Sequence, residues 1–205
     1  EKGISLGIPT TLLNIQYRMN HYIMQFPNEQ FYKNQLSASE LVSDSHLPDE
    51  QFKPIEFIDT AGCGYDEKND DSGSISNPGE IEILRKRILE INLNGASLGI
   101  ISPYRKQVTL LQETLTDYAK NCQTIDGFQG QERDIIIVTL ARSNEAGTIG
   151  FLSDYRRMNV AMTRAKKKLI IIGDSATIGG DTFYKNMLDY IEQNGSYRSA
   201  WEFLT

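Results

Sequence analysis

Several features that would identify a common class of protein are missing from this sequence. Its 205 residues contain no apolar run near the roughly 20 residues that a membrane-spanning helix needs. The N-terminus lacks the basic and then apolar pattern of a signal peptide. The two cysteines, Cys63 and Cys122, are too few for a disulfide framework or a zinc site. We therefore expect a chain without a membrane segment in a reducing compartment, the cytoplasm or, in a eukaryote, the nucleus.

The signatures of common catalytic sites are missing as well. There is no Gly-x-x-x-x-Gly-Lys-Ser/Thr phosphate-binding loop, and no Asp-Glu pair ends an apolar strand as in a magnesium-binding motif. His21 and His46 are isolated, so we expect no metal site. Nothing in the sequence indicates Ser-His-Asp catalysis. By itself, the sequence therefore lacks the groups that hold the phosphates and magnesium of ATP.

The composition fits one folded domain over residues 1–205. Apolar residues make up 40% and charged residues 23% of the chain, which is an ordinary globular balance. The chain begins at Glu1 rather than at a methionine, and we interpret it as a segment of a longer protein.

The charge is distributed unevenly along the chain. Its 21 basic and 27 acidic residues give a net charge of −6, which argues against a basic surface over the whole molecule. Residues 40–82 alone hold twelve acidic residues, whereas residues 156–168 hold six basic residues and no acidic one. We interpret residues 40–82 as a solvated surface open to a protein partner, and residues 156–168 as a local site for an anion.

Apolar patterns predict a mainly parallel sheet. Residues 55–59 alternate as a short strand does, and three apolar runs predict buried strands, at residues 98–102, 135–140 and 169–173. Because helical patterns separate these strands, we expect βαβ units, whose ligands bind at the carboxyl ends of the strands. The first candidates for a ligand site are therefore the polar segments that follow the strands, at residues 102–104, 141–144 and 173–174.

The helical patterns are less sharply bounded than the strands. Within residues 9–36 a helical stripe is interrupted at Pro27, and residues 37–54 and 60–76 are loop-like. Asn77 and Glu80 form a capping-box pattern for a helix that Gly95 closes. Three more helices are predicted, at residues 106–120, at residues 158–167 and from residue 182.

Two arginine clusters have the strongest chemical signal, at residues 16–19 and 154–166. A guanidinium is a planar, permanently charged group that suits phosphate oxygens. An arginine facing a γ-phosphate accelerates phosphoryl transfer by about 10³–10⁵. Arg157 and Arg164 are seven residues apart, so a continuous helix puts them on one face. The alternative for each arginine is a surface group or a structural ion pair.

Two further segments precede predicted strands. Residues 124–132, Thr-Ile-Asp-Gly-Phe-Gln-Gly-Gln-Glu, form a loop that can approach a phosphate or a ribose, although such loops are usually turns. Lysines 166–168 run directly into a strand, so we favour a structural or phosphate-facing role over a nuclear import signal.

Taken in order, residues 13–31, 102–104, 124–134 and 142–174 resemble the second RecA-like domain of superfamily 1B helicases. The similarity is to the branch of the nonsense-mediated-decay helicase, senataxin and the Smubp-type helicases. It covers roughly residues 10–175, with a variable acidic insertion at about 37–76. The resemblance implies an α/β fold of the P-loop NTPase (RecA-like) type, with three layers, a mainly parallel sheet and no Walker A motif of its own.

The resemblance also implies roles for particular residues. Arg18 and Arg164 would be the catalytic arginines at the γ-phosphate, with Arg164 as the arginine finger. Five residues would bind ATP: Tyr17 on the adenine, Gln129 and Gly130 along the cleft, Glu132 at the ribose, and Arg157. Four would contact the nucleic acid: Ser102, Tyr104, Thr124 and Asn159. One departure from the family pattern is Asn20-His21, where family members usually have His-Pro.

By resemblance, the chain is the C-terminal motor domain of an ATP-dependent 5′–3′ DNA or RNA helicase. ATP with Mg²⁺ would bind between this domain and an N-terminal RecA-like domain of the same parent chain, and the partner would be single-stranded DNA or RNA. That N-terminal domain would supply the phosphate loop and magnesium ligands, so we expect the isolated chain to be inactive. The alternative is a degenerate helicase domain that acts as a non-catalytic nucleic-acid-binding or scaffold module. Backbone contacts do not distinguish DNA from RNA.

Overall fold

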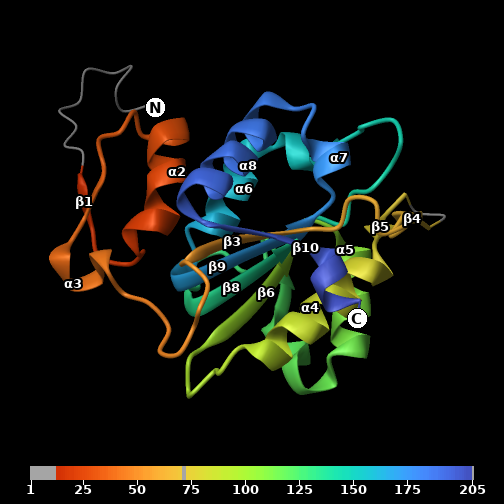
Figure 1. Cartoon of the computed structure of the whole chain (residues 1–205), viewed down its shortest axis with the longest axis horizontal. Coiled ribbons are helices and arrows are strands. Elements are labelled where there is room, and N and C mark those ends of the chain that lie inside the picture. The colour runs from red at the N-terminus through yellow and green to blue at the C-terminus, as the bar shows by residue number, and fades with distance from the viewer. Residues whose placement is uncertain (1–12, 71–72, 205) are drawn as a thin grey trace.

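The centre of the molecule is a parallel β-sheet, seen in a computed structural model that describes residues 13–70 and 73–204 (Figure 1). In this part of the chain the sheet has six strands in the order β10-β3-β9-β8-β6-β7, and every neighbouring pair is parallel. The strands are β3 (Ile55–Asp59), β6 (Leu98–Ser102), β7 (Cys122–Thr124), β8 (Arg133–Thr139), β9 (Ala165–Gly173) and β10 (Ser196–Ser199).

Helices cover both faces of the sheet, as Figure 1 shows. On one face lie α2 (His21–Phe31), α6 (Tyr155–Met162) and α8 (Thr182–Asn194), and on the other lie α4 (Pro78–Glu90) and α5 (Arg105–Thr114). Residues of β8 alternate between the two cores, because Ile136 packs with the first set of helices and Ile137 with the second. The predicted three-layer α/β fold with a parallel sheet is confirmed.

Short elements complete the described structure. These are β1 (Ile15–Gln16), β2 (Ser37–Ala38), α3 (Glu40–Ser43), β4 (Lys68–Asn69), β5 (Ile75–Ser76), α7 (Ser175–Ile178) and three 3₁₀ helices (Thr116–Asn121, Gly150–Ser153 and Ala200–Phe203). Strands β1 and β2 pair with each other beside α2, away from the main sheet.

Strand pairing overrides the predicted helix at residues 158–167. Helix α6 ends at Met162, and β9 already begins at Ala165, where it pairs with Arg133 of β8. The backbone N–H of Arg133 donates to the carbonyl of Arg164 at 3.0 Å, which extends the ladder to that residue. The prediction that Arg157 and Arg164 share one helical face is therefore wrong.

Other predicted helices differ at their ends. The helix predicted at 106–120 divides at Leu115 into α5 and a 3₁₀ helix, and Leu115 itself is buried. Helix α2 continues through Pro27 rather than being interrupted there. Helix α4 ends at Glu90, and Gly95 lies in the turn that follows, with a φ of +82°.

Only half of the predicted capping box forms at the start of α4. The side chain of Asn77 accepts from the Glu80 N–H at 3.1 Å, as predicted. The N–H of Asn77 donates to Gln107 at 2.8 Å instead of to Glu80. The carboxylate of Glu80 turns into the core and accepts from the N–H of Ala141 at 2.9 Å.

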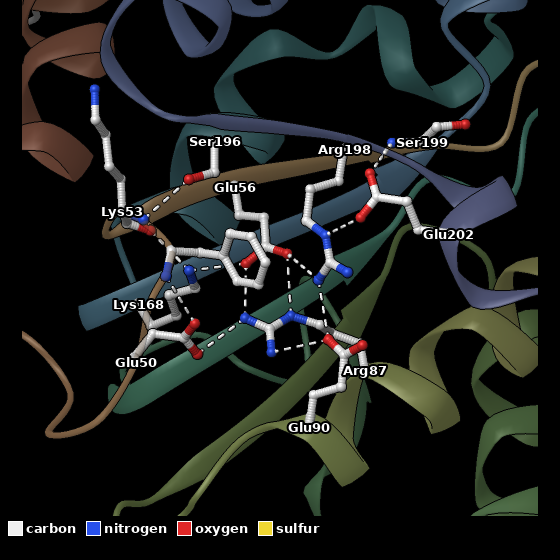
Figure 2. A network of polar contacts seen from close by, with 11 residues as sticks. Glu50, Lys53, Glu56, Arg87, Glu90, Lys168, Ser196, Arg198, Ser199 and Glu202 are labelled. Atoms are coloured by element: carbon white, nitrogen blue, oxygen red, sulfur yellow. Dashed lines mark hydrogen bonds and ion pairs between the residues drawn. The ribbon is translucent and has the colours of Figure 1, made fainter.

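The acidic residues of 40–82 are only partly a solvated surface, contrary to the sequence interpretation. Glu56 is fully buried and lies 2.8 Å from the ammonium of Lys168 and 2.9 Å from the guanidinium of Arg87 (Figure 2). Arg198 approaches Glu56 at 3.5 Å and lies over the ring of Phe52 at 4.2 Å. Lys168 therefore has the structural role that the sequence favoured.

Candidate functional site

Arg18 and Arg164 lie together where the parallel strands begin, between the starts of β8 and β9. We call this end of the strands the amino edge of the sheet, and the opposite end the carboxyl edge. Glu132 directly precedes β8, and Arg164 directly precedes β9. The Nε of Arg18 donates to Glu132 Oε2 at 2.5 Å. Its Nη1 donates to the carbonyl of Thr163, which is 145 residues away along the chain, at 3.1 Å.

The second arginine of this site is held by backbone carbonyls. The Nε of Arg164 donates to Val160 at 3.0 Å, and its Nη1 donates to Gln131 at 3.4 Å. Burial, and then the nearby positive charge of Arg18, lower the pKa of Arg164. The Arg164 guanidinium nevertheless stays charged, because arginine has the highest ordinary pKa of the protein side chains.

Positive charge is in excess here. The Nζ of Lys166 pairs with Glu132 Oε1 at 2.8 Å, so one carboxylate serves both Lys166 and Arg18. The hydrogen bond from Lys166, followed by those from Arg18, lowers the pKa of Glu132 despite some burial. With Arg164 included, three cations surround one anion, which suits a multiply charged ligand such as a phosphate group.

The segment that carries Arg18 is fixed by its own side chains. The amide oxygen of Gln16 accepts from the N–H groups of Arg18 and Met19 at 2.8 and 2.7 Å. The N–H of Asn20 donates to the carbonyl of Lys166 at 2.8 Å, which ties this segment to β9. Tyr17 is 67% exposed beside Arg18, so its ring is free to stack on a planar group.

Two more predicted ATP-binding residues, Gln129 and Gly130, lie before Glu132 in the loop that joins β7 to β8. Gln129 and Gly130 are both exposed, and Gly130 has a φ of +80°, which favours glycine. Gln129 lines a hollow together with Asp126 and Arg157.

Arg157 lies at the opposite end of α6 from Arg164. Helix α6 has 8 residues and so spans about 12 Å. The Nη2 of Arg157 donates to Asp126 at 2.5 Å, and the side chain also lines a second hollow, with Pro103, Tyr104 and Phe151. Arg157 is therefore brought together with the predicted nucleic-acid residues rather than with Arg18 and Arg164.

Three of the predicted nucleic-acid residues meet at the carboxyl edge of the sheet. The parallel pairing of β6 and β7 sets Ser102 opposite Thr124. Ser102 is buried and its hydroxyl accepts from the N–H of Tyr104 at 3.4 Å, while Thr124 accepts from the N–H of Gly127 at 3.2 Å. Tyr104 is buried too, and its hydroxyl donates to the carbonyl of Ile149 at 3.4 Å.

Asn159 lies near the amino-edge group. Its side chain donates to the hydroxyl of Tyr32, just beyond the end of α2, at 3.4 Å, and Tyr32 in turn acts electrostatically on Arg164. The structure therefore separates the predicted site residues into an amino-edge group and a carboxyl-edge group, and it places Asn159 nearer the first than the sequence prediction implied.

A buried polar layer supports the carboxyl edge. Arg142 pairs with Glu67 at 3.0 Å, and Gly150 fits closely against it, because an added Cβ would lie 2.9 Å from Arg142 Nη1. Glu80 lies beneath, and burial raises its pKa to about 8 despite the hydrogen bond from Ala141. Ala141 itself has a φ of +61°, a strained value for a residue with a Cβ.

No metal-binding group is found among the described residues: nowhere do three or more His, Cys, Asp or Glu side chains gather closely enough to hold an ion. In the same described ranges, no helix combines the length and apolar character needed to cross a membrane.

Comparison with known proteins defines the class. The AAA domain family AAA_12 matches residues 1–176. The DNA-binding protein SMUBP-2 of Mesocricetus auratus is 37% identical over 94% of this chain and 21% of its own length. The DNA polymerase alpha-associated DNA helicase A of Saccharomyces cerevisiae is 36% identical over 91% of this chain and 31% of its own length. The ATP-dependent helicase NAM7 of the same yeast is 31% identical over 95% and 22%.

The chain belongs to the AAA_12 family and is a C-terminal helicase domain of the superfamily 1 branch that the sequence predicts. It spans less than a third of the length of these relatives. Among solved structures, the C-terminal domain of a possible DNA helicase from Lactobacillus plantarum is similar with a TM-score of 0.48 and 11% identity, over 90% of this chain and 99% of that one.

Proposed function

We propose that this chain is the C-terminal motor domain of an ATP-dependent helicase that acts on single-stranded DNA or RNA. Its amino edge, with Arg18, Glu132 and Arg164, faces an ATP molecule held mainly by an N-terminal RecA-like domain of the same protein. The convergence of two arginines from distant parts of the chain is the observation that carries this proposal. It is supported by relatives named as helicases and as an ATP-dependent helicase.

The excess positive charge at the amino edge supports a role for the two arginines in stabilising the transferred phosphoryl group. In phosphoryl transfer, negative charge spreads over the oxygens of the transferred group, and a positioned guanidinium stabilises it. Arg164 is held by two carbonyls, which orient it without neutralising its charge. Arg18 exchanges part of its contact with Glu132 for the γ-phosphate, while Glu132 becomes available to the ribose and Tyr17 to the adenine.

We assign the phosphate loop and the magnesium ligands to the proposed partner domain, because this sequence has no Gly-x-x-x-x-Gly-Lys-Ser/Thr loop of its own. When bound there, Mg²⁺ neutralises charge on the phosphates. The role of this chain is to supply arginines across the cleft. It follows that the isolated chain hydrolyses ATP negligibly.

In this proposal the amino-edge group contacts ATP and the carboxyl-edge group contacts the single strand, so a change at the ATP site moves the residues that hold the strand. Arg18 and Arg164 lose their γ-phosphate contact after hydrolysis, and the cleft between the two domains then opens. The carboxyl edge, with the loop after β6 and the start of α6, moves with the rest of the sheet. Repeated closing and opening moves the protein along the strand, in the 5′ to 3′ direction.

Arg164→Ala in the full-length protein tests the proposed role. We expect ATP hydrolysis to fall by about 10³–10⁵, since an arginine finger contributes that much, while affinity for a single strand changes less than about threefold. Steady-state ATPase rates and fluorescence anisotropy with a labelled oligonucleotide measure the two effects. Arg85→Ala, an exposed arginine of α4, is the matched control. Persistent hydrolysis with lost strand binding would show that the role given to Arg164 is wrong.

A further inference from the structure

An exposed aromatic side chain stands beside the carboxyl-edge group. Phe151 is 63% exposed, in the 3₁₀ helix Gly150–Ser153 that precedes α6. Its ring centroid lies 5.7 Å from that of the buried Tyr104, at an interplanar angle of 39°. A single exposed phenylalanine is ordinary on a protein surface, so its support and its neighbours decide whether it has a role.

The backbone beneath Phe151 is held firmly. Leu152 is 2% exposed, and its carbonyl accepts from the hydroxyl of Tyr184 at 2.9 Å. The hydroxyl of Ser153 donates to the carbonyl of Gly150 at 2.8 Å. Gly150, with a φ of +55°, packs against Arg142 and Tyr104. The ring is therefore presented on a fixed support, which reduces the entropy lost when a ligand covers it.

Cationic side chains share the hollow with this ring. Arg105 and Arg157 line it together with Phe151, Tyr104 and Pro103. Arg105 and the adjacent Lys106 are both exposed at the start of α5. Arg157 pairs with Asp126 through Nη2, while its buried Nε has no hydrogen-bond partner among the described residues.

Aromatic rings beside a cationic groove are what a single strand of nucleic acid requires. Bases stack on the ring, which is tolerant of sequence, and the cations contact the phosphates. We propose that Phe151 is a stacking platform for one base of a bound single strand, with Arg105 and Arg157 contacting the phosphates beside that base. The inference rests on the proposed function and adds the base-contacting residue, which sequence patterns did not identify.

The position of the other exposed large side chains supports this choice. Leu13, Ile15 and Tyr17 lie in or beside β1, and Leu41 lies on α3. Leu89 lies on α4, and Trp201 lies in the 3₁₀ helix that packs against α4. Among the exposed large apolar side chains of the described residues, Phe151 is the one that shares a hollow with arginines at the carboxyl edge.

The test uses the full-length protein and two labelled strands, oligo-dT and oligo-U, in fluorescence anisotropy titrations at several salt concentrations. For Phe151→Ala we expect affinity for both strands to fall about 5- to 100-fold, the range for loss of one base–aromatic stack. Phe151→Trp keeps the stacking and binds as the wild type does. Trp201→Ala removes an equally exposed ring elsewhere and is the matched control.

Salt dependence separates stacking from charge. Arg105→Gln and Arg157→Gln each lower the slope of log K against log salt by about 0.7, the value for one phosphate contact on a single strand. Phe151→Ala leaves that slope unchanged. A 2-aminopurine base in either strand gives a second readout, because stacking on Phe151 quenches its emission and Phe151→Ala restores it.

The outcomes distinguish this inference from the function on which it rests. If Phe151→Ala binds both strands as tightly as the wild type while the arginine variants weaken binding, the stacking role is overturned and the proposed function stands. A loss with only one of the two strands supports stacking and assigns the strand type. If the wild type binds neither strand, the proposed function fails and this inference fails with it.

Discussion

Glu132 shows how one carboxylate organises a cationic site. It pairs with Arg18 and Lys166 through its two oxygens and keeps both side chains in place before any ligand arrives. Arg164 stands close by without an acid of its own. Such a carboxylate prevents the cations from repelling each other into solvent, yet leaves a surplus of positive charge for a phosphate.

The residue pattern of this site was predictable in part. Arg18, Glu132 and Arg164 were identified from the sequence, because their segments resemble those of a known family. Lys166 lies in the predicted cluster 154–166, but its pairing with Glu132 was not predicted, since it depends on where β8 and β9 start. Phe151 lies in the tract 142–174 that carries the resemblance but was given no role, because its exposure follows from the fold and not from its neighbours in the chain.

Glu80 gives a prediction about pH. Burial raises its folded pKa from 4.5 to about 8, so the folded state binds a proton more tightly than the unfolded state does. The contribution of Glu80 to stability is therefore fully present below about pH 4.5 and is lost as the pH rises to about 8, by about 1.4 kcal/mol per unit. Glu80→Gln keeps an acceptor for Ala141 without the charge, so we expect it to be more stable than the wild type at pH 8.

Urea unfolding of the wild type and of Glu80→Gln between pH 5 and pH 8.5 measures this difference. Glu82→Gln changes an exposed carboxylate on the same helix and serves as the control. Curves for the wild type and Glu80→Gln that stay parallel over the whole range would show that Glu80 does not titrate as proposed.

Among the elements, strands were easier to predict than helices. The apolar runs in β6, β8 and β9 identify buried parallel strands, because such strands are covered on both faces. Strands β7 and β10 escaped prediction, since both lie at the edges of the sheet and are short and largely polar. The end of α6 was misplaced because the pairing of β9 with β8, which local propensity does not encode, claims the residues that follow it.

The error about the acidic segment 40–82 also arises from contacts between residues that are distant in the chain. The sequence shows twelve acids within residues 40–82, but nothing local reveals that Glu56 meets Lys168 or that Glu67 meets Arg142. These partners lie on β9 and after β8, far along the chain. The solvated surface was therefore the natural interpretation, and it is wrong for these two residues.

The buried ion pairs of Glu56 with Arg87, Lys168 and Arg198 form a network that joins β3, α4, β9 and β10. We expect this network to contribute to stability. Lys168 is 1% exposed, whereas Lys167, its neighbour on the other face, has a side chain 36% exposed and pairs with Asp134. Lys168→Met removes one partner of the buried Glu56, so we expect a loss of about 3–5 kcal/mol in the free energy of unfolding. Lys167→Met should cost about 1 kcal/mol or less, as surface pairs do.

Urea denaturation of the two lysine variants makes the comparison directly. The double variant Glu56→Gln with Lys168→Met removes both charges and should recover part of the loss, since no carboxylate is then left without its lysine. Equal losses for Lys167→Met and Lys168→Met would mean that burial of the network does not decide its contribution.

At the scale of the whole molecule, the two groups of site residues lie at opposite edges of one sheet. One edge holds Arg18 and Arg164, and the other holds Tyr104, Phe151 and Arg157. The pattern of strands predicted a ligand site at the carboxyl edge, because that is where single α/β domains bind their ligands. Arg18 and Arg164 were identified through the arginine clusters and the family resemblance instead, and in the proposed function a second domain completes their site.

The isolated chain provides the test at this scale. If the ATP site is shared, the purified 205-residue chain hydrolyses ATP no faster than buffer, while the full-length protein is active and is stimulated by a single strand. A coupled-enzyme ATPase assay on both proteins, with circular dichroism to verify that the isolated chain folds, makes the measurement. Substantial turnover by the isolated chain would refute a shared site.

Helix α6 has a mechanical consequence. It starts near the hollow that Phe151 and Arg157 line and ends just before Arg164. In the proposed mechanism, about two turns of one helix therefore connect the residue at the γ-phosphate with the residues at the single strand.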